Sequence, residues 1–171
     1  MSTISRDQLT EAIRLRQTGR AQQDEGIMEQ ARALLLELAA AYPDDAEISY
    51  QTAWVHDNLG LEREAIPFYR RALDQGIADP DREGCLLGLG STYRGLGEYQ
   101  LAEETLRRGV SAFPQNRALQ IFLAMTLYNR HQYKEAMELV VTNLLETTSD
   151  EKLQFFKRPL LYYAHHLDEI G

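Results

Sequence analysis

The chain of 171 residues contains a single cysteine, Cys85, so no intramolecular disulfide can form and the sequence fits a reducing compartment. Because Cys85 falls within an expected helix, we predict a buried, unreactive thiol. Long apolar runs are also missing, and no stretch approaches the ~18 residues that span a bilayer. Runs of Lys and Arg, which favour a membrane surface, are absent too. The sequence therefore argues against a disulfide framework and against a membrane partner.

Positive charge is scarce, with a net charge of -8. Binding of nucleic acid needs a clustered positive surface, so we expect no nucleic-acid partner. Residues 1–7 lack the basic start and apolar run of a targeting segment, and we expect a cytoplasmic protein. Apolar residues make up 44% and charged residues 26% of the chain, which is ordinary for a soluble globular protein.

Strand signals are absent as well, because alternating runs of β-branched residues do not occur. Apolar residues instead recur at intervals of three and four throughout the chain, which predicts an all-α fold. No linker or low-complexity tract divides the sequence. We therefore expect one domain, residues 1–171, with about nine helices.

What the sequence does contain is a repeat. Ala31, Ala65, Ala102 and Ala136 follow one another in steps of 34, 37 and 34 residues. The third unit has the fullest pattern around its alanine, which comprises Leu86, Leu89, Gly90, Tyr93, Gly97, Tyr99, Ala102 and Pro114. The 3 extra residues of the middle step fall within residues 75–81.

This pattern resembles the tetratricopeptide repeat, a helix–turn–helix unit of 34 residues. The units lie near residues 12–45, 46–82, 83–116 and 117–149, and the chain is similar to short, stand-alone bacterial members of the family. The resemblance implies a right-handed superhelical solenoid of four helix hairpins. Solenoids need terminal caps, and residues 150–171 carry an apolar stripe suited to a capping helix. The stripe consists of Leu153, Phe156, Leu160, Leu161, Ala164 and Leu167, and Pro159 should kink or split this segment.

Caps and turns can be placed from single residues. We expect the first helix to start at Ser5 and Gly26 to mark the turn into the second helix. Asp44 is the expected cap of the third helix, and Asn116 that of the seventh. Pro67 should lie about one turn inside the second helix of unit two, on its outer face, where the freed carbonyl of Arg63 can reach water.

In this family the first helices of the units line a concave inner wall. Carried over to this sequence, the resemblance assigns partner binding to eight residues of this wall. Most are Trp, Tyr or Arg, the residue types that are enriched at binding hot spots, and the others are apolar. These residues are Arg16, Arg20, Tyr50, Trp54, Leu87, Arg94, Met125 and Tyr128.

Two alternatives remain open at this point. The arginines of the wall suggest a ligand with at least one carboxylate, but they would equally well pair with Glu47 and Asp57. Trp54 and Tyr50 either face the groove or fill the space between successive helices.

Other sites are disfavoured by the residues themselves. Chaperone-binding members of the family grip a carboxylate with a clamp of Lys, Asn and Arg, but two of the corresponding positions here are Gly84 and Gly88, which offer no side-chain donor. These glycines lack the Lys-Ser or Lys-Thr of a phosphate loop and suit close helix packing better. Helical spacing would put His165 beside Asp168 and Glu169, but a solvated helix end is favoured over a metal site.

We therefore expect no catalytic residues, no cofactor and no metal. The predicted function is a non-enzymatic module that binds a peptide or a partner's helix in its concave groove, and the partner is expected to be acidic. The alternative is a self-associating scaffold whose groove is filled by a neighbouring copy.

Overall fold

The computed structural model describes residues 3–169 and places ten helices within them. Their order is α1 (Thr3–Gln22), α2 (Glu25–Ala41), α3 (Ala46–Asn58), α4 (Glu62–Asp74), α5 (Asp81–Gly95), α6 (Tyr99–Ala112), α7 (Arg117–Asn129), α8 (Tyr133–Thr147), α9 (Glu151–Phe155) and α10 (Lys157–His165). No strand occurs in this range. The all-α prediction is thus confirmed.

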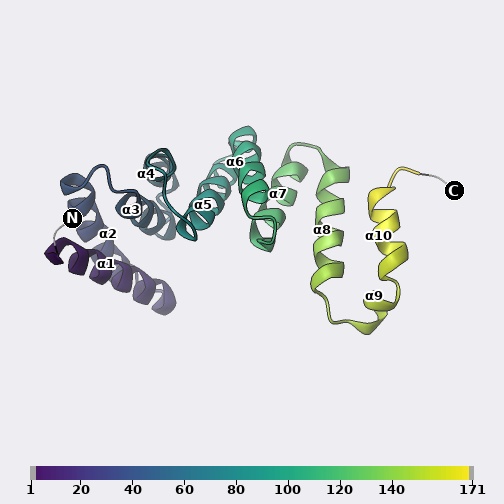
Figure 1. Ribbon diagram of the computed structural model, residues 1–171, viewed down its shortest axis with the longest axis horizontal. Helices are drawn as coiled ribbons and strands as arrows, with labels where there is room; N and C mark the ends of the chain where they lie inside the picture. Colours follow the sequence, from purple (N-terminus) through teal and green to yellow (C-terminus); the bar gives the residue numbers. More distant parts are fainter. Residues whose placement is uncertain (1–2, 170–171) are drawn as a thin grey trace.

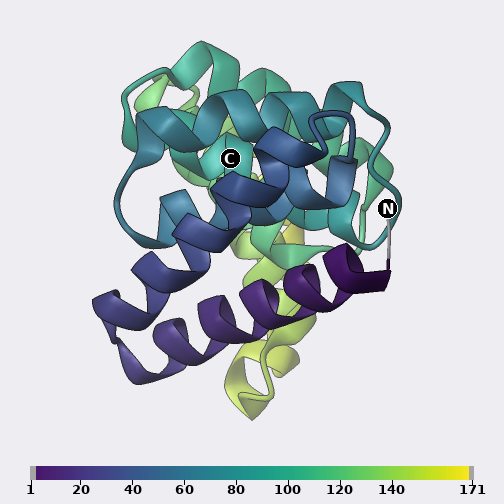
Figure 2. The same ribbon diagram turned by 90° about the vertical axis from the view of Figure 1, so that its left-hand side faces the viewer.

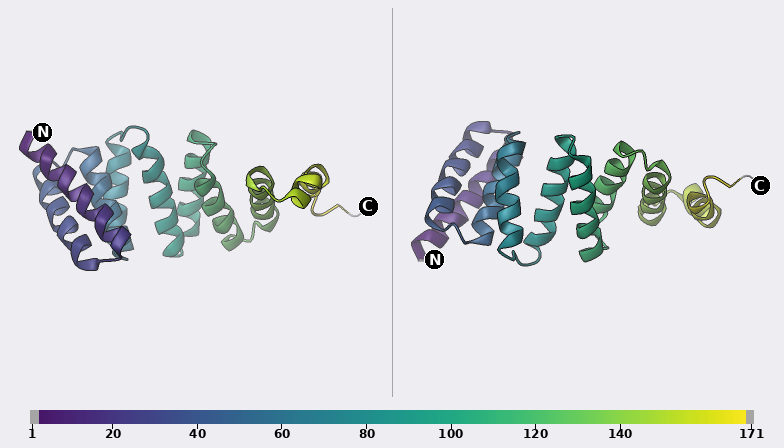
Figure 3. Two further views of the ribbon diagram at one scale, coloured as in Figure 1. Left: turned by 90° about the horizontal axis from the view of Figure 1, so that it is seen from below. Right: turned by 90° about the horizontal axis from the view of Figure 1, so that it is seen from above.

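Consecutive helices pair into four hairpins, α1–α2, α3–α4, α5–α6 and α7–α8. The hairpins follow one another along the long axis, with the two termini at opposite ends (Figures 1 and 3). Each second helix also packs on the first helix of the next hairpin, and the first helices α1, α3, α5 and α7 contact one another in succession. Viewed from the N-terminal end, α1 and α2 cover this end of the stack (Figure 2). The predicted solenoid of four hairpins is confirmed.

The repeating alanines lie where two helices of a hairpin meet. Ala31, Ala65 and Ala102 are fully buried, and Ala136 is 6% exposed. A small side chain lets the two backbones approach closely, which explains the fixed spacing. The apolar core forms two clusters, one around Leu35 in the first hairpin and a larger one that runs from Tyr50 to Ala136.

The hairpin turns need one residue in the left-handed conformation. Gly60 and Gly97 supply it with φ of 71° and 79°, as glycine does at least cost. His131 takes the same conformation in the turn of unit four, which has no glycine. The expectation for Gly26 is wrong. The first turn lies three residues earlier, at Gln23, because the carboxylate of Asp24 accepts the Ile27 N–H and starts α2 there.

Two other predicted helix starts are also corrected. Asp45, not Asp44, caps α3 by accepting the Ile48 N–H. Ser5 lies inside α1, which already begins at Thr3, and its hydroxyl contacts that of Tyr42. The predicted cap Asn116 is confirmed, since its side chain accepts the Leu119 N–H.

Pro67 lies inside α4 and is exposed, as expected for a proline that removes a helical hydrogen bond. The C-terminal segment is not one stripe, because it divides at Phe156 into α9 and α10, and Pro159 falls in the first turn of α10. This division makes ten helices instead of nine. Ala164 is buried against α8, whereas Phe156 and Leu167 stay exposed at 54% and 45%.

Candidate functional site

Two tyrosines fix the third hairpin against the second. An added Cβ at Gly84 would lie 2.1 Å from the Tyr50 hydroxyl, and one at Gly88 would lie 2.4 Å from the Tyr69 hydroxyl. Both tyrosines are almost fully buried, at 3% and 1% exposure. The glycines of α5 therefore serve close packing, as predicted. Cys85 between them is buried, its thiol donates to the carbonyl of Tyr69, and burial raises the pKa of the thiol to about 12.

Asp57 links the same hairpins through hydrogen bonds. Its carboxylate accepts from the hydroxyl of Tyr69 at 3.1 Å and from that of Thr92 at 2.9 Å. Burial raises the pKa of Asp57 and outweighs these two hydrogen bonds, which lower it. Asp57 is thus fully engaged between α3, α4 and α5.

The N-terminal part of the predicted wall is largely packed. Arg16 is only 2% exposed, its guanidinium carbon lies 3.7 Å from the centre of the Trp54 ring, and its Nε donates to Gln51 at 3.2 Å. Trp54 is half-buried and stacks on Tyr50 with 5.4 Å between ring centres. Burial lowers the pKa of Arg16 to about 10, so the group stays charged at neutral pH. Tyr50 and Arg16 therefore join α1, α3 and α5.

The proposed pairing of the wall arginines with Glu47 and Asp57 is wrong. Glu47 pairs with Arg6 at 2.6 Å, and Asp57 is held by Tyr69 and Thr92. Neither Arg16 nor Arg20 forms an ion pair within residues 3–169. Arg20 is exposed and, with Arg16, Gln17, Ala21 and Trp54, lines an open pocket of about 360 Å³.

The C-terminal part of the wall forms a second, mostly apolar pocket of about 430 Å³. Three predicted residues, Arg94, Met125 and Tyr128, meet there. The other lining residues are Ala124, Tyr133, Ala136, Met137 and Val140. Tyr128 is 63% exposed and packs edge-on against Tyr133, with 5.3 Å between ring centres. Leu87 lies outside both of these pockets and packs on the larger core cluster.

The residues that α8 contributes were missed by the sequence analysis. The resemblance places the inner wall on first helices, whereas α8 is a second helix. A signal was available, because Tyr133, Met137, Val140 and Leu144 are apolar at helical spacing and form an additional stripe beside the one that packs on α7. All four are exposed, at 53%, 50%, 42% and 47%. We call these four residues the α8 stripe.

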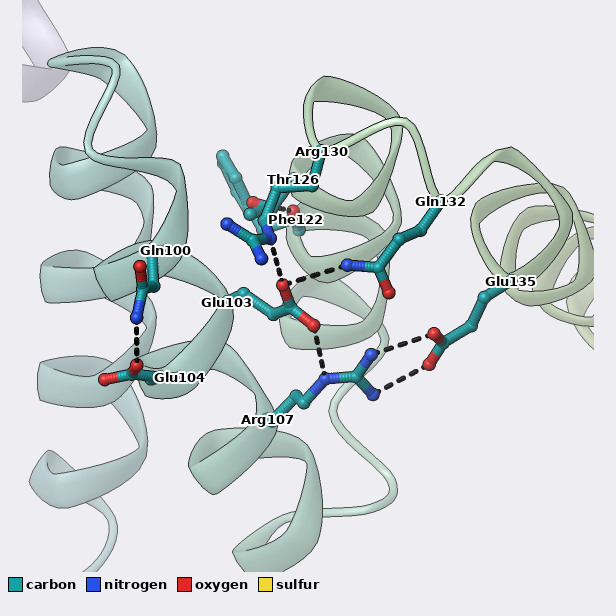
Figure 4. A network of polar contacts seen from close by, with 9 residues as sticks. All are labelled: Gln100, Glu103, Glu104, Arg107, Phe122, Thr126, Arg130, Gln132 and Glu135. Atoms are coloured by element: carbon teal, nitrogen blue, oxygen red, sulfur yellow. Dashed lines mark hydrogen bonds and ion pairs between the residues drawn. The ribbon is translucent and has the colours of Figure 1, made fainter.

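A polar network holds the turn that carries Tyr133 (Figure 4). Glu103 of α6 accepts from Arg130 and Gln132 of the α7–α8 turn, and Arg107 donates to both Glu103 and Glu135. The hydrogen bonds from Arg107 lower the pKa of Glu135. The network thus fixes the start of α8 relative to α6, and with it one edge of the apolar pocket.

His165 does not gather Asp168 and Glu169 as the spacing suggested. His165 ends α10, so Asp168 and Glu169 lie beyond the helix and share no helical face with it. The His165 ring instead contacts the carboxylate of Glu138 in α8. Residues 3–169 contain no group of three or more His, Cys, Asp and Glu side chains arranged to hold a metal. None of the helices in this range is long and apolar enough to cross a membrane.

Several solved structures share this architecture. MamA 41-end from Desulfovibrio magneticus RS-1 is 19% identical, with a TM-score of 0.69, over 94% of this chain and 90% of that one. The TPR-like repeats of a Podosopora anserina putative kinesin light chain are 20% identical, with a TM-score of 0.72, over 97% and 88%. MamA AMB-1 is 21% identical, with a TM-score of 0.63, over 95% and 94%.

Among curated proteins, none is significantly similar in sequence. The sequence model of the family described as Tetratrico peptide repeat matches residues 46–167, well over half of the chain. This match, the 34-residue alanine spacing and the four stacked hairpins agree: the chain belongs to the tetratricopeptide repeat family.

Proposed function

We propose that this protein is a non-enzymatic interaction module that binds a peptide or a partner's helix on its inner surface. The observation that carries the proposal is the apolar pocket, which brings Arg94, Met125 and Tyr128 together with three of the four residues of the α8 stripe, all except Leu144. Monomeric proteins rarely leave a contiguous apolar patch of this kind uncovered, and such patches commonly mark sites of association.

The residue types support a protein ligand. Tyrosine supplies large contact area at low conformational cost, and methionine adapts its shape to varied apolar side chains. Met125 of α7 and Met137 of α8 both line the pocket. The anchors of the partner are therefore apolar side chains, and Arg94 at the edge sets its orientation.

The pocket at Arg16, Arg20 and Trp54 supplies a second, polar contact for the same ligand. Two arginines one helical turn apart, neither of which forms an ion pair among the described residues, favour an acidic group there. Because Arg16 is fixed on Trp54, the exposed Arg20 is the arginine that can reach out to a ligand. The preferred partner is thus apolar where it meets α7 and α8 and acidic where it meets α1.

Comparative affinity capture tests the proposal. Wild type, Val140→Glu and Leu101→Glu serve as baits in one native lysate, and the captured proteins are quantified by mass spectrometry. Val140 and Leu101 are equally exposed, at 42% and 43%, but Leu101 lies on α6 outside the pocket. We expect at least one protein retained by wild type and Leu101→Glu and lost from Val140→Glu. Identical capture by all three baits would contradict the proposal.

The alternative function is a self-associating scaffold. The observation that favours it is the number of exposed aromatic residues at the C-terminal end, including Phe155 at 81% and Tyr163 at 63%. Sedimentation velocity over a concentration series separates the alternatives, because only a scaffold shows a mass that rises with concentration and falls in Val140→Glu.

A further inference from the structure

The α8 stripe contains a register position that every earlier unit buries. One turn after the repeating alanine stand Leu35, Tyr69, Leu106 and Val140. The first three are 0%, 1% and 0% exposed, whereas Val140 is 42% exposed. The position one turn further on behaves alike, since Ala39 is 6% exposed, Leu73 and Val110 are half-buried, and Leu144 is 47% exposed.

The residue next to the repeating alanine shows the same contrast. In unit three it is Glu103, which Arg130 and Gln132 from the end of α7 and its turn cover through hydrogen bonds (Figure 4). In unit four it is Met137, which is 50% exposed. The difference in exposure thus depends on what packs against each second helix from the following unit, because the helix register itself is unchanged.

In the first three units a helix of the next unit packs over these positions of the second helix. α3, α5 and α7 each pack on the preceding second helix and on the preceding first helix as well. α10 packs on α8 along a different side, where Glu138 contacts His165. Beyond the end of α10, Asp168 pairs with Lys134 of α8. α10 is not among the helices in extended contact with α7, and neither α9 nor α10 contributes to the lining of the apolar pocket. The position of a fifth first helix is therefore left open.

We infer that a helix supplied by another protein occupies this open position, packs its apolar stripe on α7 and α8, and presents a carboxylate to Arg94. This inference rests on the proposed function and names the class of partner. The occupant is a helix because the same position holds a helix in each of the three preceding units. The occupant carries a carboxylate because the Nε–H of Arg94, at the edge of the pocket, is buried without any acceptor among the described residues.

A second copy of this chain fits the position poorly. The outward side of its α1 is polar, with Arg6, Glu11, Arg14 and Gln17 exposed, so it has no apolar stripe to offer. The exposed aromatic residues Phe155 and Phe156 of its C-terminal segment directly precede Lys157 and Arg158, which would bring positive charge to Arg94. An acidic amphipathic helix from a different protein satisfies both the apolar pocket and the arginine.

Synthetic peptides test the inference with the full-length protein. The probes are fluorescein-labelled, end-capped amphipathic helices of about 16 residues, with leucines at helical spacing and one glutamate moved along the edge of the stripe from peptide to peptide. Each has a counterpart with glutamine at that place. Fluorescence anisotropy gives the Kd for wild type, Val140→Glu, Met137→Glu, Arg94→Gln and the control Leu101→Glu, and circular dichroism verifies that each variant is folded.

We expect the best glutamate peptide to bind wild type and Leu101→Glu alike and to bind Val140→Glu and Met137→Glu at least about tenfold more weakly, a difference of about 1.4 kcal/mol. Arg94→Gln should weaken the binding of the glutamate peptide several-fold and leave the Kd of its glutamine counterpart unchanged. This difference is the coupling that a double-mutant cycle isolates.

If both α8 variants lose binding but Arg94 and the glutamate show no coupling, the inference that the partner presents a carboxylate is wrong, whereas the proposed binding site is still supported. Equal affinity in Val140→Glu and Leu101→Glu would overturn the helix position itself. A concentration-dependent dimer of wild type that Val140→Glu abolishes would show that a second copy is the occupant and would likewise overturn the inference.

Discussion

The guanidinium of Arg16 in α1 lies 3.7 Å from the centre of the Trp54 ring in α3, and Arg16 is buried together with its charge. Trp54 in turn stacks on Tyr50, whose hydroxyl reaches Gly84 of α5. Three first helices are thus connected through a cation, an indole and a phenol. The tryptophan both packs between helices and lines a pocket.

The first prediction concerns this stack. Arg16→Ala should lower the free energy of unfolding by about 2 kcal/mol, because it removes a desolvated cation–π contact and the packing of a buried aliphatic stem. Urea denaturation followed by the fluorescence of Trp54, the single tryptophan, measures it. Arg20→Ala, four residues on and exposed, is the control and should change stability little. Equal losses in the two variants would count against the stack.

The second prediction concerns the contact of Tyr69 with Gly88. A Cβ at Gly88 would lie within 2.8 Å of the hydroxyl oxygen and two ring carbons of Tyr69, which is 1% exposed. Overpacking costs about 1–3 kcal/mol, which exceeds the ~1 kcal/mol that alanine gains over glycine in a helix. We therefore expect Gly88→Ala to lower the melting temperature. Gly95→Ala in the same helix meets nothing within 4 Å and should leave it unchanged or slightly higher.

The third prediction concerns pH. Burial raises the pKa of Asp57 above the ~3.9 of an unfolded chain, and the charge of Glu62 acts in the same direction. The folded state therefore holds this proton to higher pH than the unfolded state. The contribution of Asp57 to stability is greatest below the unfolded-state pKa and falls as pH rises through the folded-state pKa.

Asp57→Asn does not titrate in this range and serves as the reference. We expect the free energy of unfolding of wild type, minus that of the variant, to decrease as pH rises from about 3, and then to level off. Urea titrations at a series of pH values give this difference. A difference that increases with pH would show that the hydrogen bonds from Tyr69 and Thr92 outweigh burial.

The fourth prediction concerns the C-terminal helices. Deletion of residues 150–171 uncovers the side of α8 that contacts Ala164 and His165 and enlarges the exposed apolar surface. We expect a lower melting temperature and increased binding of a hydrophobic dye. A truncated chain with unaltered stability would mean that α9 and α10 do not act as a cap.

Much of the fold follows from spacing that the sequence displays directly. The alanines at steps of 34, 37 and 34 residues identify a buried position in each hairpin, and Asn116 identifies a helix start, because both depend on local chemistry. The first turn was predicted at Gly26 from glycine alone, and the structure corrects it, because the side chain of Asp24 accepts the Ile27 N–H and starts α2 earlier.

The candidate site was predictable only in part. The repeat pattern places Arg94 of α5 and both Met125 and Tyr128 of α7 on the same face of the first helix of their units. These three residues do meet in one pocket. The apolar spacing of the α8 stripe is visible in the sequence, but the exposure of Val140 is not, because its equivalents Leu35, Tyr69 and Leu106 are buried and the pattern assigns it the same role. It depends on where α10 packs. Pro159 correctly predicts that the C-terminal segment divides, but the sequence does not indicate on which side of α8 the second piece packs.

The central claim is that the partner binds at α7 and α8, at the C-terminal end of the inner surface. The most direct test is a titration of the ¹⁵N-labelled protein with the glutamate-bearing amphipathic peptide, with chemical-shift changes mapped by NMR. We predict that the largest changes fall on residues 124–144 and on the side chain of Arg94, with the indole N–H of Trp54 shifted much less. Changes centred on Trp54 and Arg20, with α8 unperturbed, would contradict the account.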